Sequence, residues 1–131
     1  MAEDNNKPLV LIVDDDEDML VLLQVKLAAE GFNPVSSPNA EKLMQLIHEK
    51  RPDIILLDIH MQGTDGGATC QELKSDPGTS SIPVIMFSST EKIEEVSKQC
   101  GADGFMVKPL DSDKLRKTIH QIVDQAGSTP S

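Results

Sequence analysis

The sequence predicts an α/β fold in which five parallel strands form one sheet between two layers of helices. Short, almost continuous apolar runs alternate five times with segments of helical period, which is typical of a parallel sheet covered on both faces. The chain of 131 residues suits a single domain with one core. Pro34 lies in the second run and cannot donate a ladder hydrogen bond, which places that strand at an edge of the sheet. Together these observations favour the strand order 2-1-3-4-5.

The five predicted strands are apolar runs bounded by turn or capping residues. They are 9–13 (LVLIV), 32–36 (FNPVS), 54–58 (IILLD), 83–88 (PVIMFS) and 104–108 (GFMVK). Each is followed by a segment whose apolar residues repeat with helical spacing. Their apolar positions are Met19, Leu23 and Leu27; Leu43, Leu46 and Ile47; Ile93, Val96 and Cys100; and Leu115, Ile119, Ile122 and Val123. The third helix, after TDGG, has the weakest pattern and rests on Thr69, Cys70 and Leu73.

Capping residues support these helix positions. Asp16 is expected to cap the first helix, and either Asp111 or Ser112 the last. Ser37 followed by Pro38 is typical of a helix start. Gly31 and Gly101 stand where two helices should end.

The composition indicates how the chain is organised and which partners it excludes. We expect an N-terminal tail at 1–7, one domain at 8–125 and a C-terminal tail or linker at 126–131. The net charge of −10 argues against direct nucleic-acid binding. No apolar signal core or membrane-length segment is present, so a cytoplasmic protein without a membrane partner is expected. Cys70 and Cys100 are expected to be buried free thiols, with a disulfide between them left open.

Polar residues gather where the predicted strands end. Asp14 and Asp15 follow the first strand, Asp58 closes the third, Ser88 the fourth and Lys108 the fifth. Ligands of such sheets bind outside the carboxyl ends of the strands. Three carboxylates suit a hard cation such as Mg²⁺ better than zinc. Asp58 could then act as a nucleophile that forms an acyl phosphate, with Ser88 and Lys108 contacting phosphoryl oxygens.

Four motifs, VLIVDDD, PDIILLDIHMQGTDG, IPVIMFSS and GADGFMVKPL, resemble the receiver domain of two-component response regulators over about residues 8–125. The resemblance implies the CheY-like form of the flavodoxin-like fold. It assigns the phosphoacceptor to Asp58, and Mg²⁺ binding to Asp14, Asp15, Asp58 and the backbone carbonyl of His60. It further implies that Ser88, Ser89 and Lys108 contact the phosphoryl group and that Phe105 is the aromatic switch residue. His60 and Thr90 would tune the rate of dephosphorylation. The peptide bond between Lys108 and Pro109 would be cis.

The resemblance also implies a function. The chain would accept a phosphoryl group from a sensor histidine kinase or a histidine phosphotransfer protein. Phosphorylation would change the face formed by the fourth helix, fifth strand and fifth helix, roughly 91–123, toward a downstream protein target or output domain. Such a protein is a signalling switch rather than an enzyme, because it catalyses only its own phosphoryl transfer and autodephosphorylation. A phosphorylation-dependent homodimer is left open.

Some residues depart from the family pattern. Gln62 stands where proline is common, and Ser88 replaces the more usual threonine. Phe105 replaces a tyrosine, so its switch must work by packing alone. These differences leave one alternative, a phosphorylation-independent pseudo-receiver that acts as a scaffold. Two other classes fit less well: His60 disfavours a haloacid-dehalogenase-like phosphatase, and the acidic run DDDED would repel the phosphate of FMN in an electron carrier.

Overall fold

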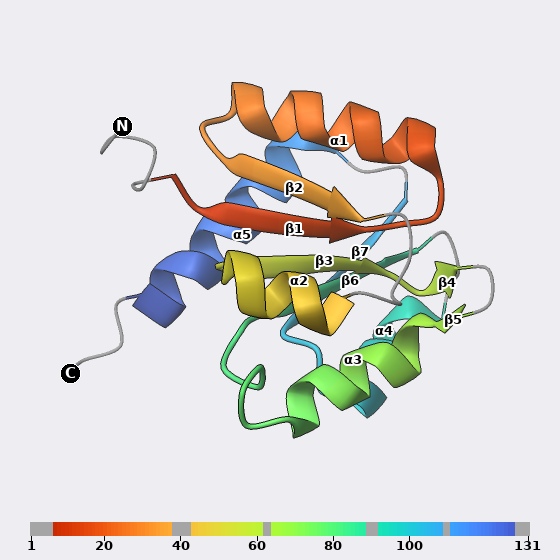
Figure 1. Ribbon diagram of the computed structural model, residues 1–131. Helices are drawn as coiled ribbons and strands as arrows, with labels where there is room; N and C mark the ends of the chain where they lie inside the picture. The colour runs from red at the N-terminus through yellow and green to blue at the C-terminus, as the bar shows by residue number, and fades with distance from the viewer. Residues whose placement is uncertain (1–6, 38–42, 62–63, 89–91, 109–110, 128–131) are drawn as a thin grey trace.

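The computed structural model describes residues 7–37, 43–61, 64–88, 92–108 and 111–127 (Figure 1). Five parallel strands form one sheet in the order β2-β1-β3-β6-β7, which is 2-1-3-4-5 when these strands are counted along the chain. They are β1 (Leu9–Val13), β2 (Asn33–Ser37), β3 (Ile54–Asp58), β6 (Val84–Ser88) and β7 (Gly104–Val107). The predicted fold class and strand order are confirmed.

Helices cover both faces of the sheet (Figure 1). They are α1 (Glu17–Ala29), α2 (Leu43–Lys50), α3 (Gly66–Ser75), α4 (Ile93–Cys100) and α5 (Ser112–Gly127). Successive strand residues point to opposite faces, so β1 contributes to two cores. Val10 and Ile12 pack with α1 and α5, whereas Leu11 and Val13 pack with α2, α3 and α4. The strands are therefore buried on both faces, which explains their continuous apolar sequences.

The second predicted strand is shifted by one residue. The sequence placed it at 32–36, but β2 spans Asn33–Ser37, and Phe32 is a buried core residue. β2 lies at an edge of the sheet, with Pro34 opposite Val10 of β1, as the proline predicts. The fourth strand was predicted at 83–88, but β6 begins at Val84, so Pro83 lies outside it. The fifth was predicted at 104–108, but β7 ends at Val107, and Lys108 follows it directly.

The ends of α1 follow the expected capping chemistry. The side chain of Asp16 accepts hydrogen bonds from the backbone N–H of Asp18 at 3.1 Å and of Met19 at 3.3 Å. Gly31, just beyond the helix, has a φ of +95°, a conformation that favours glycine. Asp16 is therefore the N-cap of α1, and its carboxylate is engaged with that helix.

The end of α4 and the start of α5 carry the predicted capping residues, whereas the predicted helix start at Ser37 and Pro38 lies partly outside the described residues. Gly101 ends α4 with a φ of +83°, and Asp111 caps α5 by accepting hydrogen bonds from the N–H of Asp113 and of Lys114. Ser37 is the last residue of β2. Residues 38–42 lie outside the described part of the chain, so the cap at Ser37 and Pro38 stays a prediction.

A feature that the sequence did not predict lies between β3 and α3. There, β4 (His60–Met61) and β5 (Thr64–Asp65) pair in antiparallel fashion. The pairing brings the start of α3 back beside the end of β3. None of the helices that the structure describes is long and apolar enough to cross a membrane.

Candidate functional site

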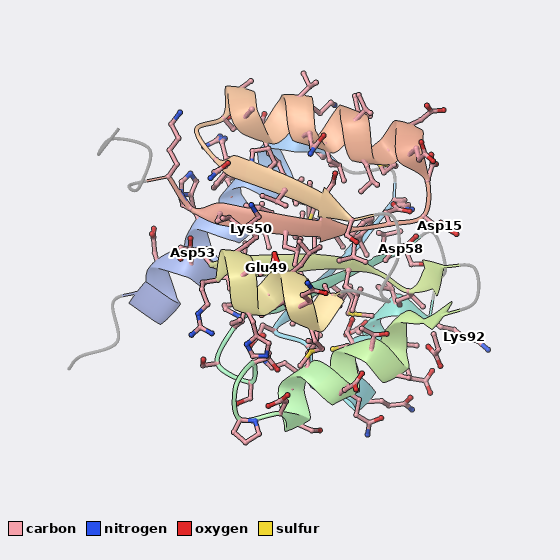
Figure 2. All side chains as sticks on the ribbon, in the orientation of Figure 1. Asp15, Glu49, Lys50, Asp53, Asp58 and Lys92 are labelled. Atoms are coloured by element: carbon pink, nitrogen blue, oxygen red, sulfur yellow. The ribbon has the colours of Figure 1, made fainter. Side chains whose placement is uncertain are left out.

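The carboxyl ends of the central strands lie level with one another. Val13 of β1 pairs with Leu57 of β3, and Asp58 pairs with Phe87 of β6. In turn, Ser88 pairs with Val107 of β7. The residues that end or follow these strands are consequently neighbours across the sheet, as predicted from the strand order. Figure 2 shows Asp15 and Asp58 at the carboxyl ends of these strands, whereas Asp53, which precedes β3, lies at the opposite end of that strand.

Three carboxylates converge at the carboxyl ends of the central strands. Oxygen atoms of Asp14, Asp15 and Asp58 all lie within 4.8 Å of one another. Asp14 is fully buried and Asp58 is 3% exposed, whereas Asp15 is exposed to solvent. At this separation, two carboxylates repel by about 3 kcal/mol at an effective dielectric constant of 20. A nearby positive charge would offset this repulsion.

Lys108 provides one positive charge. Its Nζ lies 3.3 Å from Oδ2 of Asp14 and 3.5 Å from Oδ2 of Asp58. The ammonium group also lies 5.1 Å from the centroid of the Phe87 ring, within the range of a cation–π contact. The backbone N–H of Lys108 donates to the carbonyl of Ser88 at 2.8 Å, which fixes the chain directly after β7. Lys108 is therefore held where its charge offsets both buried carboxylates.

Asp14 is fixed on both sides of its carboxylate. While Oδ2 faces Lys108, Oδ1 accepts a hydrogen bond from the N–H of Asp16 at 3.0 Å. Its own backbone N–H donates to the carbonyl of Ser37, at the end of β2. The DDD run thus divides into separate tasks: Asp14 is a buried, oriented carboxylate, Asp15 reaches the surface, and Asp16 caps α1.

The segment after Asp58 is held by backbone contacts. The N–H of Ile59 donates to the carbonyl of Phe87 at 3.1 Å, and its carbonyl accepts from the N–H of Gly66 at 3.0 Å. A Cβ atom at Gly66 would collide with the carbonyl oxygen of Asp58 and lie 2.6 Å from Cα of Ile59. Only glycine fits this close approach.

Sequence reasoning missed the role of Gly66. A usable signal was present, because glycine is unfavourable in helices and two consecutive glycines open α3. Close approach of another backbone is one of the situations in which glycine is used. Here that backbone belongs to Asp58 and Ile59.

The carboxylate cluster fits a hard divalent cation. Its donors are oxygens, which Mg²⁺ and Ca²⁺ prefer, and among the described residues this is the only group of at least three acidic, histidine or cysteine side chains close enough to bind a metal. The fully buried Asp14 and the exposed Asp15 give such an ion both a fixed ligand and a side open to water. Mg²⁺ usually keeps several waters, so this partly exposed arrangement suits it.

The remaining predicted site residues fall into two groups. Ser88 is buried at the end of β6, and Phe105 lies in β7 with 38% of its surface exposed. The backbone of His60 lies in β4, directly after Ile59. Outside the described residues lie the side chain of His60 and the following positions: Gln62, Ser89, Thr90 and Pro109. The cis peptide and the rate-tuning roles accordingly stay predictions.

Comparison with known proteins gives a consistent result. Residues 10–120 match the model of the response regulator receiver domain. The chain is 36% identical over 117 residues to the "Response regulator PleD" of Caulobacter vibrioides, covering 86% of this chain and 25% of that protein. It is 32% identical over 119 residues to the "Probable transcriptional regulator ycf27" of Guillardia theta, covering 89% of this chain and 46% of that protein.

Solved structures agree with these sequence matches. A putative response regulator from Chloroflexus aurantiacus superposes with a TM-score of 0.84 at 25% identity, covering 91% of this chain and 99% of that one. The signal receiver domain of a signal transduction histidine kinase from Syntrophus aciditrophicus gives a TM-score of 0.84 at 29% identity, covering 95% and 96%. By contrast, the chain spans about half the length of the first curated relatives, between 46% and 52%.

Proposed function

The chain belongs to the response regulator receiver domain family, and from this membership we propose that it is switched by phosphorylation of Asp58. The phosphoryl group would come from a phosphohistidine of a sensor histidine kinase or a phosphotransfer protein. One observation carries the proposal. Asp58 is a buried carboxylate at the carboxyl ends of the strands, where ligands of such sheets bind, and it lies beside two further carboxylates and the ammonium group of Lys108.

The chemistry is a transfer between two covalent carriers. A carboxylate oxygen of Asp58 attacks phosphorus, the bond from phosphorus to the histidine nitrogen breaks, and the histidine leaves with its electron pair. The product is an acyl phosphate on Asp58. Lys108 stays within reach of a phosphoryl oxygen, because its Nζ lies only 3.5 Å from Oδ2 of Asp58. The hydroxyl of Ser88, at the adjacent strand end, can donate a hydrogen bond to another oxygen.

We propose that Mg²⁺ is the cofactor. Asp14, Asp15, Asp58 and the backbone carbonyl of His60 would hold it, consistent with the oxygen-only donor set of the cluster. When bound, it neutralises negative charge on the transferred phosphoryl group. Asp14 is already oriented for this role by the N–H of Asp16.

The signalling output would come from α4, β7 and α5. Phe105 and Val107 leave 38% and 50% of their surface exposed on β7, an edge strand that directly precedes Lys108. Exposed apolar side chains on an edge strand suit a protein contact. Phosphoryl oxygens that draw Ser88 inward would favour one arrangement of Phe105 over another, and the face would change accordingly. The target could be an output domain, a separate protein or a second copy of the chain.

The proposal also defines what the protein does not do. It would act as a switch rather than as an enzyme with steady turnover, in the cytoplasm and without direct nucleic-acid binding. The net charge of −10 supports the last point. Turnover of phosphomonoesters over many cycles would contradict it.

The test is a direct measurement of phosphorylation. The protein is incubated with a small phosphodonor and Mg²⁺ and weighed intact. Wild type is expected to gain one phosphoryl group, and Asp58→Asn none. Asp53→Asn is the matched control: this carboxylate lies at the other end of β3, and asparagine can still accept the hydrogen bond that Asp53 receives from Leu9 at 2.7 Å. If wild type gains no mass, the proposal fails and the scaffold alternative is favoured. If Asp58→Asn gains as much mass as wild type, the proposal fails because another residue carries the phosphoryl group.

A further inference from the structure

Two cysteines that lie far apart in the sequence meet between α3 and α4. Sγ of Cys70 lies 2.8 Å from Sγ of Cys100, although 30 residues separate them. Both are free thiols, and they lie in the core beneath the two helices. The S–S bond of a disulfide is about 2.05 Å long, so the two sulfurs need to approach by less than 1 Å. No part of the proposed phosphorylation chemistry uses them.

We propose that Cys70 and Cys100 are an oxidation site, at which a peroxide-class oxidant forms an intramolecular disulfide that ties α3 to α4. The two sulfurs already face each other, and their contacts with backbone carbonyls are weak. Sγ of Cys70 donates to the carbonyl of Cys100 and Sγ of Cys100 to the carbonyl of Ser97, both at 3.6 Å. Little is lost when those contacts are replaced by a covalent bond.

The surroundings indicate which thiol reacts first. Cys100 is 6% exposed and lines a pocket of about 520 Å³ between the two helices, together with Val96 and Gln99 of α4 and Gln71 of α3. Cys70 is fully buried and does not line this pocket. Burial and the neighbouring Cys100 raise the pKa of the Cys70 thiol, which makes Cys70 the weaker nucleophile toward peroxide. Cys100 is thus the thiol that a small oxidant reaches.

The proposed reaction balances with hydrogen peroxide as the oxidant. The sulfur of Cys100 attacks one peroxide oxygen, the O–O bond breaks, and one water leaves, with sulfenic acid on Cys100. The sulfur of Cys70 then attacks the sulfur of Cys100, the S–O bond breaks, and the thiol proton leaves with the hydroxyl as a second water. Two thiols lose two electrons and two protons in total, and one peroxide becomes two waters. A dithiol reductant reverses the change by thiol–disulfide exchange.

The disulfide would restrain one particular part of the fold. Cys100 is the last residue of α4, and Cys70 lies in the middle of α3, so the bond ties the C-terminal end of α4 to its neighbour. Disulfides in reducing compartments are usually transient and have catalytic or redox-sensing roles. In the role proposed above, α4 belongs to the signalling face, so oxidation would limit the movement of that face. This last consequence rests on the proposed function, whereas the oxidation site does not.

The first experiment uses the folded wild-type chain without phosphodonor or Mg²⁺. The protein is treated with hydrogen peroxide, quenched with an alkylating agent in denaturant, and weighed intact and after proteolysis. The intact mass is expected to fall by two hydrogen atoms, neither cysteine is alkylated, and one cross-linked peptide pair contains Cys70 and Cys100. Treatment with a dithiol is expected to restore both alkylation sites.

Two variants test the order of the reaction. Cys70→Ala is expected to stop at sulfenic acid on Cys100, which a 1,3-diketone probe traps. Cys100→Ala is expected to leave Cys70 alkylatable at the same dose of peroxide. A glutathione redox titration adds a measurement on wild type alone: the disulfide is expected to form with an equilibrium constant at least about tenfold larger in the native protein than in the urea-unfolded chain.

Several results would overturn the proposal. They are full alkylation of wild type after peroxide, addition of oxygen without loss of two hydrogens, a cross-link between two chains, or a disulfide that forms only in urea.

Hydrogen exchange in α4 is compared in the oxidised and reduced protein, with and without phosphodonor and Mg²⁺. Slower exchange at the end of α4 on oxidation alone supports the restraint, and unchanged exchange refutes it. Lack of any response to phosphodonor in the reduced protein counts only against the proposed function.

Discussion

Lys108 contacts Asp14 across 94 residues of sequence, with its Nζ 3.3 Å from Oδ2 of a carboxylate that has no exposed surface. The same ammonium group lies 3.5 Å from Asp58. Two buried negative charges therefore share one positive charge, while the third carboxylate, Asp15, faces solvent. This charge imbalance determines how the site should respond to substitution and to metal.

Replacement of Lys108 by methionine is expected to destabilise the protein and to strengthen metal binding. Without the ammonium group, Asp14 and Asp58 lose the ion pairs that Lys108 makes with them, at a cost of about 3 kcal/mol in the free energy of unfolding. A divalent cation then relieves a larger repulsion, so Mg²⁺ should raise the melting temperature of Lys108→Met more than that of wild type. Urea unfolding and thermal melts with and without Mg²⁺ measure both effects.

Lys117→Met is the matched control for this prediction, because Lys117 is an exposed lysine of α5. It should change neither stability nor the response to Mg²⁺ appreciably. A Lys108→Met protein as stable as wild type would show that the cation does not compensate the two buried carboxylates.

Asp15→Asn should separate stability without metal from metal binding. Removal of one charge from the cluster relieves repulsion, so the metal-free variant is expected to be at least as stable as wild type. The same change removes a metal ligand, and the stabilisation by Mg²⁺ should be lost. For wild type that stabilisation is about 1.4 kcal/mol when the metal is at tenfold excess over its Kd.

Thermal melts across a magnesium titration measure this difference, with Asp18→Asn as the control. Asp18 is also an exposed carboxylate, in the first turn of α1 and outside the cluster. A melting temperature of wild type that does not change with Mg²⁺ would contradict the proposed metal site.

Most of this site follows from the sequence because parallel strands align their carboxyl ends. Once the apolar runs are assigned as strands and Pro34 is placed at an edge, Asp14 and Asp58 must meet, however far apart they are in sequence. Asp16 was also predictable, since capping depends on residues within one helical turn. These relationships depend on periodicity and local chemistry.

Other contacts were not predictable, because they depend on how closely particular atoms approach. The spacing of Cys70 and Cys100 suggests no relationship, yet the packing of α3 on α4 brings their sulfurs to 2.8 Å. The β4–β5 pair involves only two residues on each side, too short for a recognisable alternation. Gly66 was visible only as a residue unsuited to a helix, and the atoms that require it come from β3 and the residue after it.

Asp16→Ala tests whether the aspartates after β1 have separate roles. The substitution removes the acceptor for the N–H groups of Asp18 and Met19, and loss of such an N-cap costs about 1 kcal/mol. Its backbone N–H still donates to Asp14, so the carboxylate cluster keeps its arrangement. We expect a lower midpoint of urea unfolding with an unchanged gain from Mg²⁺. A loss of that gain would mean that Asp16 takes part in metal binding.

Gly66→Ala is expected to impair the site through the backbone alone. An added Cβ would collide with the carbonyl oxygen of Asp58 and lie 2.6 Å from Cα and 2.9 Å from the carbonyl oxygen of Ile59. Because these atoms are backbone, the strand end or the start of α3 must shift, at a cost of about 2 kcal/mol. We expect the end of β3 to take part in this shift, which would move Asp58 relative to Lys108, so phosphorylation by a small phosphodonor should also slow.

Gly78→Ala provides the comparison, because Gly78 is exposed and an added Cβ there would meet its nearest atom, Oδ1 of Asp76, only at 3.4 Å. Stability and the rate of mass gain are measured for both variants under identical conditions. The expected result is a defect in both quantities at Gly66 and in neither at Gly78. If Gly66→Ala loses stability but Asp58 is phosphorylated at the wild-type rate, the close backbone approach supports the fold and does not position the phosphoacceptor.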